Sequence, residues 1–222
     1  MSSVASVNAL DELEQVESTP VPPPSFNLRL PSRGVSVVPD PGAYGGGTRS
    51  SRGGVIAQSW QEAMADALAD AGVDVAAWVP ESRLDAIVTR LAARGVAVRT
   101  LTREDECVAY AAGRRLGGGH PVVMMQSSGL GNALNALGSL VVPYGLGIPM
   151  VISMRGTLGE GNPAQVPMGR AVRPLLDALG LQAFTVRWPD EVVAAARGVV
   201  DLAEGARASS ALILESELGG RG

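Results

Sequence analysis

From Val55 onward, apolar residues recur in two alternating patterns, short continuous runs and longer segments with helical spacing. The short runs predict strands at 73–79, 96–98, 122–126, 148–153, 182–186 and 211–214. The helically spaced segments predict helices at about 60–71, 83–93, 103–116, 131–140, 168–179 and 190–203. Continuous apolar strands are typical of a sheet that is covered on both faces. The sequence therefore predicts an α/β protein, a three-layer α/β/α fold around a six-stranded, mostly parallel sheet.

Local signals indicate where individual helices begin and end. Ser59 and Glu62 have the spacing of a capping box, and Gly72 follows the helix that they open. Thr102 is expected to cap the helix that runs to about Leu116.

The first part of the chain has a different composition. Residues 1–54 contain a proline cluster at 22–24, a glycine run at 45–47 and many serines, with little periodic hydrophobicity. Such a composition predicts a flexible extension, and residues 55–222 form the predicted folded domain. The extension is either a tail without a role or a segment that docks onto a partner subunit.

Composition excludes several classes of protein. The net charge of −4 argues against a general binder of nucleic acid or of anionic membranes. All 18 basic residues are arginine, so a phosphate loop with a Walker lysine and a Schiff-base lysine are both excluded. With a single histidine, His120, and a single cysteine, Cys107, neither a cluster of such metal ligands nor an internal disulfide can form. His120 is expected to be a solvated loop residue, and Cys107 a small packing residue.

The N-terminus has no charged start followed by an apolar run, and no apolar stretch has the length of a membrane span. We therefore expect neither a secretory signal nor a membrane helix, and a cytoplasmic location.

Ligands of parallel α/β sheets bind where the strands end, and three segments at such positions carry candidate chemistry. The first is 102–106, whose acidic residues either complement the helix dipole or place one carboxylate in a cleft. The second is 126–132, where Gly129 and Gly131 would let the backbone approach a ligand. As a dinucleotide fingerprint this segment is weak, because Leu134 stands at the third glycine position.

The third segment begins at Met154 and ends at Arg170. Arg155 and Arg170 could form an anion site through forked hydrogen bonds, or could pair with neighbouring acidic residues on the surface. Between them, the glycine-rich residues 159–163 could form a mobile lid or an ordinary solvated loop.

Taken together and in order, these segments resemble the pyrimidine-binding domain of thiamine-diphosphate-dependent 2-oxo-acid decarboxylases. The resemblance rests on Thr102-Arg103-Glu104 with Ala112-Gly113, on 126–132, on Arg155-Gly156 and on 164–170, and it covers about residues 55–214. Within this family, the chain is most similar to the alpha subunits of sulfopyruvate decarboxylases, and next to phosphonopyruvate decarboxylases. The run at 164–170 favours the sulfopyruvate branch.

The resemblance implies roles for particular residues. Glu104 would be the catalytic glutamate that hydrogen-bonds N1′ of the cofactor's aminopyrimidine. The other implied cofactor-binding residues are Gln126, Ser128, Gly129, Leu130 and Asn132. The implied substrate-binding residues are Ser82, Arg155, Gln165 and Arg170.

The family also needs a domain that binds the diphosphate through Mg²⁺ and carries a Gly-Asp-Gly sequence, which is absent from this chain. The resemblance therefore implies a hetero-oligomer, in which a separate beta subunit binds Mg²⁺ and this chain binds no metal. The implied reaction is decarboxylation of a small anionic 2-oxo acid, most simply sulfopyruvate to sulfoacetaldehyde and CO2. The alternatives are phosphonopyruvate or another anionic 2-oxo acid, a non-catalytic regulatory or scaffold homologue, and a stand-alone nucleotide-binding module.

Overall fold

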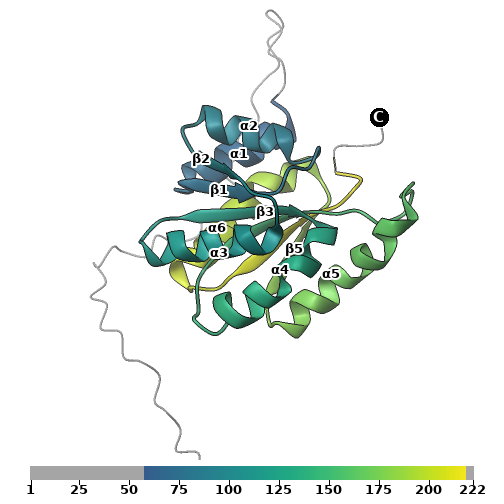
Figure 1. The fold of residues 1–222 in the computed structure, drawn as a ribbon. Helices are drawn as coiled ribbons and strands as arrows, with labels where there is room; N and C mark the ends of the chain where they lie inside the picture. Colours follow the sequence, from purple (N-terminus) through teal and green to yellow (C-terminus); the bar gives the residue numbers. More distant parts are fainter. Residues whose placement is uncertain (1–57, 219–222) are drawn as a thin grey trace, which may run out of the picture. The chain divides into compact units, whose positions relative to one another are not determined.

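The computed structural model describes residues 58–218, and in this part the predicted fold class is confirmed (Figure 1). Six parallel strands form one sheet in the order β2-β1-β3-β4-β6-β5. The strands are β1 (Val75–Trp78), β2 (Ala97–Thr100), β3 (Pro121–Gln126), β4 (Pro149–Ser153), β5 (Gln182–Val186) and β6 (Ser210–Leu214). The predicted extension at 1–54 lies outside the described residues.

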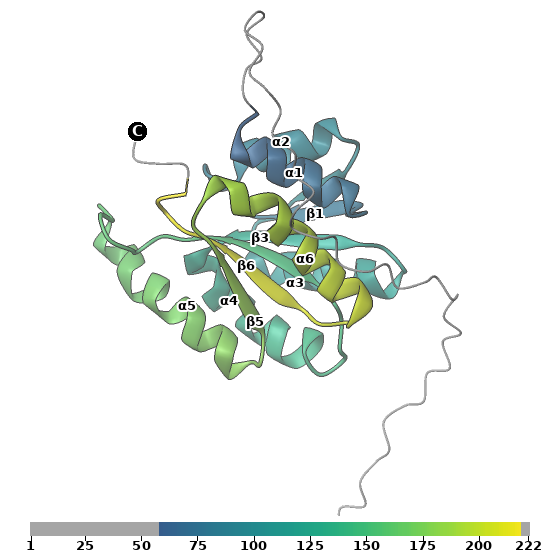
Figure 2. The ribbon, with the colours of Figure 1, turned by 180° about the vertical axis from the view of Figure 1, so that it is seen from behind.

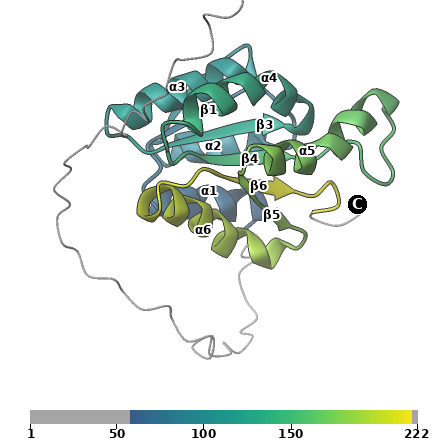
Figure 3. The ribbon, with the colours of Figure 1, turned by 90° about the horizontal axis from the view of Figure 1, so that it is seen from below.

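Helices cover both faces of this sheet, as its apolar strands predict. They are α1 (Trp60–Asp70), α2 (Asp85–Ala93), α3 (Glu104–Leu116), α4 (Leu130–Ala136), α5 (Val166–Ala178) and α6 (Val192–Gly205). Figure 3 shows α3, α4 and α5 on one side of the sheet and α1 and α6 on the other, and Figure 2 shows α1, α2 and α6 together. Among the described helices, none combines the length and the apolar character that crossing a membrane would require.

The register of the strands brings four of their ends to one edge of the sheet. Gln126 pairs with Ser153, and Ser153 pairs with Leu214. On the other side of β3, Trp78 pairs with Met124, two residues before the end of that strand. We call this row of strand ends the carboxyl edge. The predicted ligand-binding residues lie at these strand ends, in the loops that follow, or in the first turns of the helices after them, and Glu104 opens α3 after the neighbouring strand β2.

Two predicted helix starts need correction. The N-cap of α3 is Arg103 rather than Thr102, because the Glu106 carboxylate folds back and accepts from the amides of both residues. The helix predicted to start at Gly131 begins earlier, with a 3₁₀ turn at Ser127–Gly129. It continues as the α-helix α4 and ends as a π-helix at Leu137–Val141. Apolar spacing alone does not distinguish these helix types.

A close backbone approach holds the start of α5 against the loop after β4. A Cβ on Gly169 would overlap the carbonyl oxygen of Arg155, and a Cβ on Gly156 would overlap the carbonyl oxygen of Gln165. Gly156 also has a φ of 78°, in the left-handed region that glycine tolerates best. These two glycines therefore allow α5 to lie directly on the Arg155-Gly156 turn.

Replacing Gly169 with alanine is expected to lower the free energy of unfolding by about 1–3 kcal/mol, because the added methyl group has to displace backbone atoms. Gly198→Ala in α6 is the matched control, since no atom lies within 4 Å of its added Cβ. The control is expected to gain up to about 1 kcal/mol of helix propensity. Denaturant unfolding measures both variants, and equal stability of the two would contradict the overlap at Gly169.

Candidate functional site

The acidic residues at the start of α3 have different tasks. The Glu106 carboxylate accepts from the Thr102 hydroxyl at 2.8 Å and from two backbone amides, and the Thr102 hydrogen bond lowers its pKa. Asp105 pairs with Arg103 at 3.0 Å, and this hydrogen bond lowers the pKa of Asp105. Both carboxylates therefore serve the helix start itself, and Glu104 is the acidic residue left to face the loop after β3.

Glu104 is partly buried and lies against the helical turn that follows β3. Its Oε2 accepts a hydrogen bond from Nδ2 of Asn132 at 2.8 Å. A Cβ on Gly129 would overlap the end of the Glu104 side chain, so the glycine supplies the space that the carboxylate occupies. Among the described residues, no donor binds its Oε1. The structure thus brings together Glu104, Gly129 and Asn132, which the sequence analysis had grouped.

The remaining residues of this segment lie around the same turn. Ser128 donates to Oε1 of Gln126 at 2.7 Å, which orients the amide at the end of β3. Leu130 is completely buried in the core under α3 and therefore supports this turn from within.

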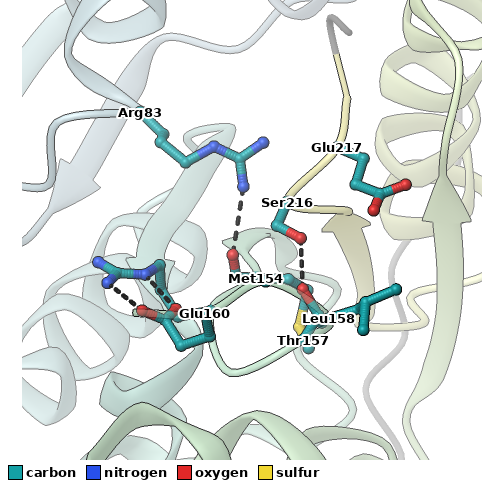
Figure 4. Close-up of a pocket in the computed structure, with 9 residues that line it drawn as sticks. Arg83, Met154, Thr157, Leu158, Glu160, Ser216 and Glu217 are labelled. Atoms are coloured by element: carbon teal, nitrogen blue, oxygen red, sulfur yellow. Dashed lines mark hydrogen bonds and ion pairs between the residues drawn. The ribbon is translucent and has the colours of Figure 1, made fainter. Parts of the chain in front are cut away.

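A hollow of about 750 Å³ lies beside this turn, where β1, β4 and β6 end (Figure 4). Its wall comes from three loops: the one after β1, the one between β4 and α5, and the chain after β6. The lining residues are Arg83, Met154, Arg155, Thr157, Leu158, Gly159, Glu160, Ser216 and Glu217. Thr157 and Ser216 are joined by a hydrogen bond between their hydroxyls, which connects two of the loops.

Arg83 contributes a cation to this hollow. Its guanidinium donates to the carbonyl oxygens of Met154 at 3.2 Å and Glu215 at 2.7 Å. Burial lowers the pKa of Arg83, because charge is costly in a partly dehydrated position. The residue therefore links three strand ends and remains a half-buried cation.

Arg155 is paired inside the same hollow. Its Nε and Nη2 donate to the two oxygens of Glu160 at 2.7 and 2.8 Å. Glu160 also accepts from the amides of Gly156 and Asn162, and the Arg155 hydrogen bonds hold its pKa well below the usual range. The predicted lid is thus a loop that an ion pair and two backbone hydrogen bonds hold closed on itself.

A row of polar contacts connects the hollow with the turn at Gln126. The buried Ser127 hydroxyl accepts from the Arg155 amide at 3.1 Å. The buried Ser153 hydroxyl donates to Glu81 at 2.9 Å, and Glu81 also accepts from the Arg83 amide. Hydrogen bonds therefore connect the two parts of the candidate site, the turn after Gln126 and the hollow, along the carboxyl edge.

The other predicted substrate-binding residues lie nearby in different environments. Ser82 is exposed in the turn before α2, next to Arg83. Oε1 of Gln165 is buried, and no hydrogen-bond partner for it is present in the described chain. Arg170 is exposed on α5 and does not line the hollow, so the structure does not bring it and Arg155 together there.

Sequence reasoning missed Arg83, Glu81 and Glu160. Ser82, which the family resemblance indicates, lies between Glu81 and Arg83, so the charged neighbours of Ser82 were the available signal for both. For Glu160 there was no signal, because its pairing with Arg155 depends on the conformation of the loop.

Cys107 and His120 agree with their predicted environments. Cys107 is completely buried, and burial raises the pKa of its thiol to about 12. His120 is exposed at the opposite edge of the sheet, where Nδ1 lies 2.8 Å from Glu204.

Comparisons with known proteins find sequences that are similar to this chain. Residues 58–155 match the family described as "Thiamine pyrophosphate enzyme, N-terminal TPP binding domain". The alpha subunit of sulfopyruvate decarboxylase from Methanococcus maripaludis is 39% identical over 131 residues, which are 59% of this chain and 78% of that subunit. Phosphonopyruvate decarboxylase from Streptomyces viridochromogenes is 37% identical over 113 residues, which are 50% of this chain and 28% of that protein.

A solved structure supports the fold. The 2-oxoglutarate:ferredoxin oxidoreductase from Magnetococcus marinus superposes with a TM-score of 0.51 and 11% sequence identity. The match covers 71% of this chain and 29% of that larger chain. At this identity the likeness concerns the fold alone.

The Arg155–Glu160 pair predicts how the loop at 156–162 responds to mutation and pH. In Glu160→Gln we expect faster hydrogen exchange of the loop amides near neutral pH, because the charge-assisted hydrogen bonds are lost. Since the pKa of Glu160 is lowered from its usual 4.5, its contribution is present above that value and is lost as the pH falls. The variant and the wild type should therefore converge in acid.

Glu191→Gln is the matched control, because Glu191 accepts from two backbone amides at the start of α6. It should leave exchange in the loop at 156–162 unchanged. Equal exchange of this loop in Glu160→Gln and in the wild type at neutral pH would contradict the role of the ion pair.

Proposed function

Since the chain belongs to the family of sulfopyruvate decarboxylase alpha subunits, we propose that it is the pyrimidine-binding subunit of a split, thiamine-diphosphate-dependent decarboxylase. The proposed substrate is sulfopyruvate, and the products are sulfoacetaldehyde and CO2. A separate beta subunit with a Gly-Asp-Gly sequence would bind the diphosphate and Mg²⁺. The naming of the relative as a subunit supports the existence of this partner.

The observation that carries the proposal is the arrangement of Glu104. Its neighbours Asp105 and Glu106 are engaged by Arg103 and Thr102, whereas Glu104 is held by Asn132 against Gly129. A carboxylate that is oriented in this way, with one oxygen that accepts from no donor among residues 58–218, is suited to hold a proton or a hydrogen bond at a fixed place.

The residues present fit the aminopyrimidine of thiamine diphosphate. Glu104 offers Oε1 as an acceptor, and the Gln126 amide at the end of β3 offers further polar groups. Gly129, without a side chain, leaves the space in which the carboxylate lies. The buried Oε1 of Gln165, which lacks a hydrogen-bond partner among residues 58–218, is a further acceptor that a ligand donor could satisfy.

When bound, thiamine diphosphate supplies the electron sink that a 2-oxo acid needs in order to lose CO2. Glu104 would share a proton with N1′ of the aminopyrimidine through Oε1, while Asn132 keeps the carboxylate in position through Oε2. Gln126 and Ser128 would orient the ring, while the buried residues Gly129 and Leu130 would support the turn that carries them. Ser82, Gln165, Arg155 and Arg170 are the substrate contacts that the family resemblance implies, and of these only Arg155 lines the hollow.

The second candidate substrate is phosphonopyruvate, since phosphonopyruvate decarboxylases are also among the similar proteins. Both substrates end in a tetrahedral oxyanion, so the same hollow could receive either. The sulfopyruvate decarboxylase subunit is similar over a larger share of this chain, 59% against 50%, which supports the sulfonate as the first choice.

The proposal is tested by purifying the chain from its source together with whatever binds it. We expect a second chain with a Gly-Asp-Gly sequence, and a complex that releases CO2 from sulfopyruvate faster than from phosphonopyruvate. Recovery of the chain alone would contradict the split enzyme and would favour the regulatory or scaffold alternative. Equal rates would contradict the preference for the sulfonate.

Within this complex, Glu104→Gln is expected to lower kcat by about 10²- to 10⁴-fold, the usual range for loss of a positioned acid–base group. Assembly should be unchanged, as checked by size-exclusion chromatography. Glu106→Gln is the matched control, because it removes a neighbouring carboxylate that caps α3. Full turnover by Glu104→Gln would refute the proposed role.

A further inference from the structure

Arg83 differs from the other half-buried arginines in what it binds. Both of its hydrogen bonds go to neutral backbone carbonyls, and no ion pair of Arg83 is found within residues 58–218. By contrast, Arg155 binds both oxygens of Glu160, and Arg115 at the opposite edge pairs with Glu204. A half-buried cation that is not hydrogen-bonded to a carboxylate is costly. The nearby carboxylates of Glu81 and Glu215 offset part of this cost, and an anionic ligand in direct contact would offset more.

The surroundings of Arg83 are suited to such a ligand. A guanidinium carries five N–H donors, and the two carbonyl contacts leave donors free to face the hollow. Arg155 and Glu160 neutralise each other on the same wall. Glu217, the other acidic side chain of the wall, points away from Arg83 in Figure 4. Arg83 is therefore the cation through which the hollow can attract an anion.

We propose that Arg83 binds the terminal anionic group of the substrate, a sulfonate or another tetrahedral oxyanion. This inference rests on the proposed function for the identity of the ligand, but the cation and the hollow are observed independently of it. The proposed site differs from the anion site of Arg155 and Arg170 that the sequence suggests. Arg155 is bound to Glu160, and Arg170 lies outside the hollow.

The chemistry of decarboxylation indicates which anion of the substrate should meet the arginine. The carboxylate loses its charge as neutral CO2 leaves, so a cation there would stabilise the substrate more than the transition state. The terminal sulfonate keeps its charge throughout the reaction. A cation on that group holds the substrate without opposing the reaction, and this is the role we assign to Arg83.

The test measures binding without catalysis. All nine lining residues belong to this chain, so the full-length chain alone is expected to bind ethanesulfonate, as measured by isothermal titration calorimetry. Arg83→Met should weaken this binding by about 10- to 100-fold, since hydrogen bonds to charged groups contribute on that scale. Arg83→Lys, which keeps the charge but loses the fork, should bind with an intermediate affinity.

Arg115→Met is the matched control, because Arg115 also donates to backbone carbonyls, those of Gly119 and Ala203, but far from the hollow. It should bind ethanesulfonate as the wild type does. The affinity for ethyl methyl sulfone, which carries no charge, should be the same in the wild type and in all variants. Circular dichroism tests whether each variant is folded. If Arg83→Met does not fold, the affinity of Arg83→Lys relative to the wild type tests the inference.

Two outcomes would overturn the inference: no binding of ethanesulfonate by the wild-type chain, or equal binding by the wild type and the folded Arg83 variants. Failure of the proposed function is distinguishable from both. In that case the chain binds ethanesulfonate through Arg83, but its complex releases no CO2 from sulfopyruvate.

Discussion

The parallel pairing of β1, β3, β4 and β6 is the constraint on which the candidate site depends. Because Gln126, Ser153 and Leu214 are in register, loops that are distant in sequence leave the sheet side by side. The buried hydroxyls of Ser127 and Ser153 then hydrogen-bond across these loops. No single loop contains the site, and a shift of one strand would separate the carboxylate at α3 from the cation after β1.

Local capping at the start of α3 leaves one acidic residue for function. Consecutive carboxylates repel each other, yet two of the three are satisfied within the helix start, Asp105 by Arg103 and Glu106 by Thr102. Glu104 could then be committed to Asn132 and to the space beside Gly129 without loss of the cap. Helix stability and the proposed acid–base role are thus divided between neighbouring residues.

The sequence predicted the fold class and all six strands, because these follow from apolar runs. The meeting of strand ends at one edge indicated the segments 102–106 and 126–132, and the choice of Glu104 among the acidic residues came from the family resemblance. It misplaced the start of α3 by one residue, since the Glu106 carboxylate, rather than the Thr102 hydroxyl, satisfies the first amides. It could not assign partners to arginines. Whether Arg155 faces a ligand or Glu160, and whether Arg83 meets a carbonyl or a carboxylate, depends on loop conformations that apolar spacing does not encode.

The glycine contacts at Gly156 and Gly169 have a consequence for how this protein could be re-engineered. They pack the start of the loop, at Arg155 and Gly156, against Gln165 and α5 through backbone atoms, so this contact does not depend on the side chains of residues 157–163. Residues 157–163 could therefore be exchanged as a cassette while the sheet and α5 stay in place. A library built in that interval would reshape one wall of the hollow and leave Glu104 untouched, which makes the loop a natural starting point for directed evolution of new ligand preferences.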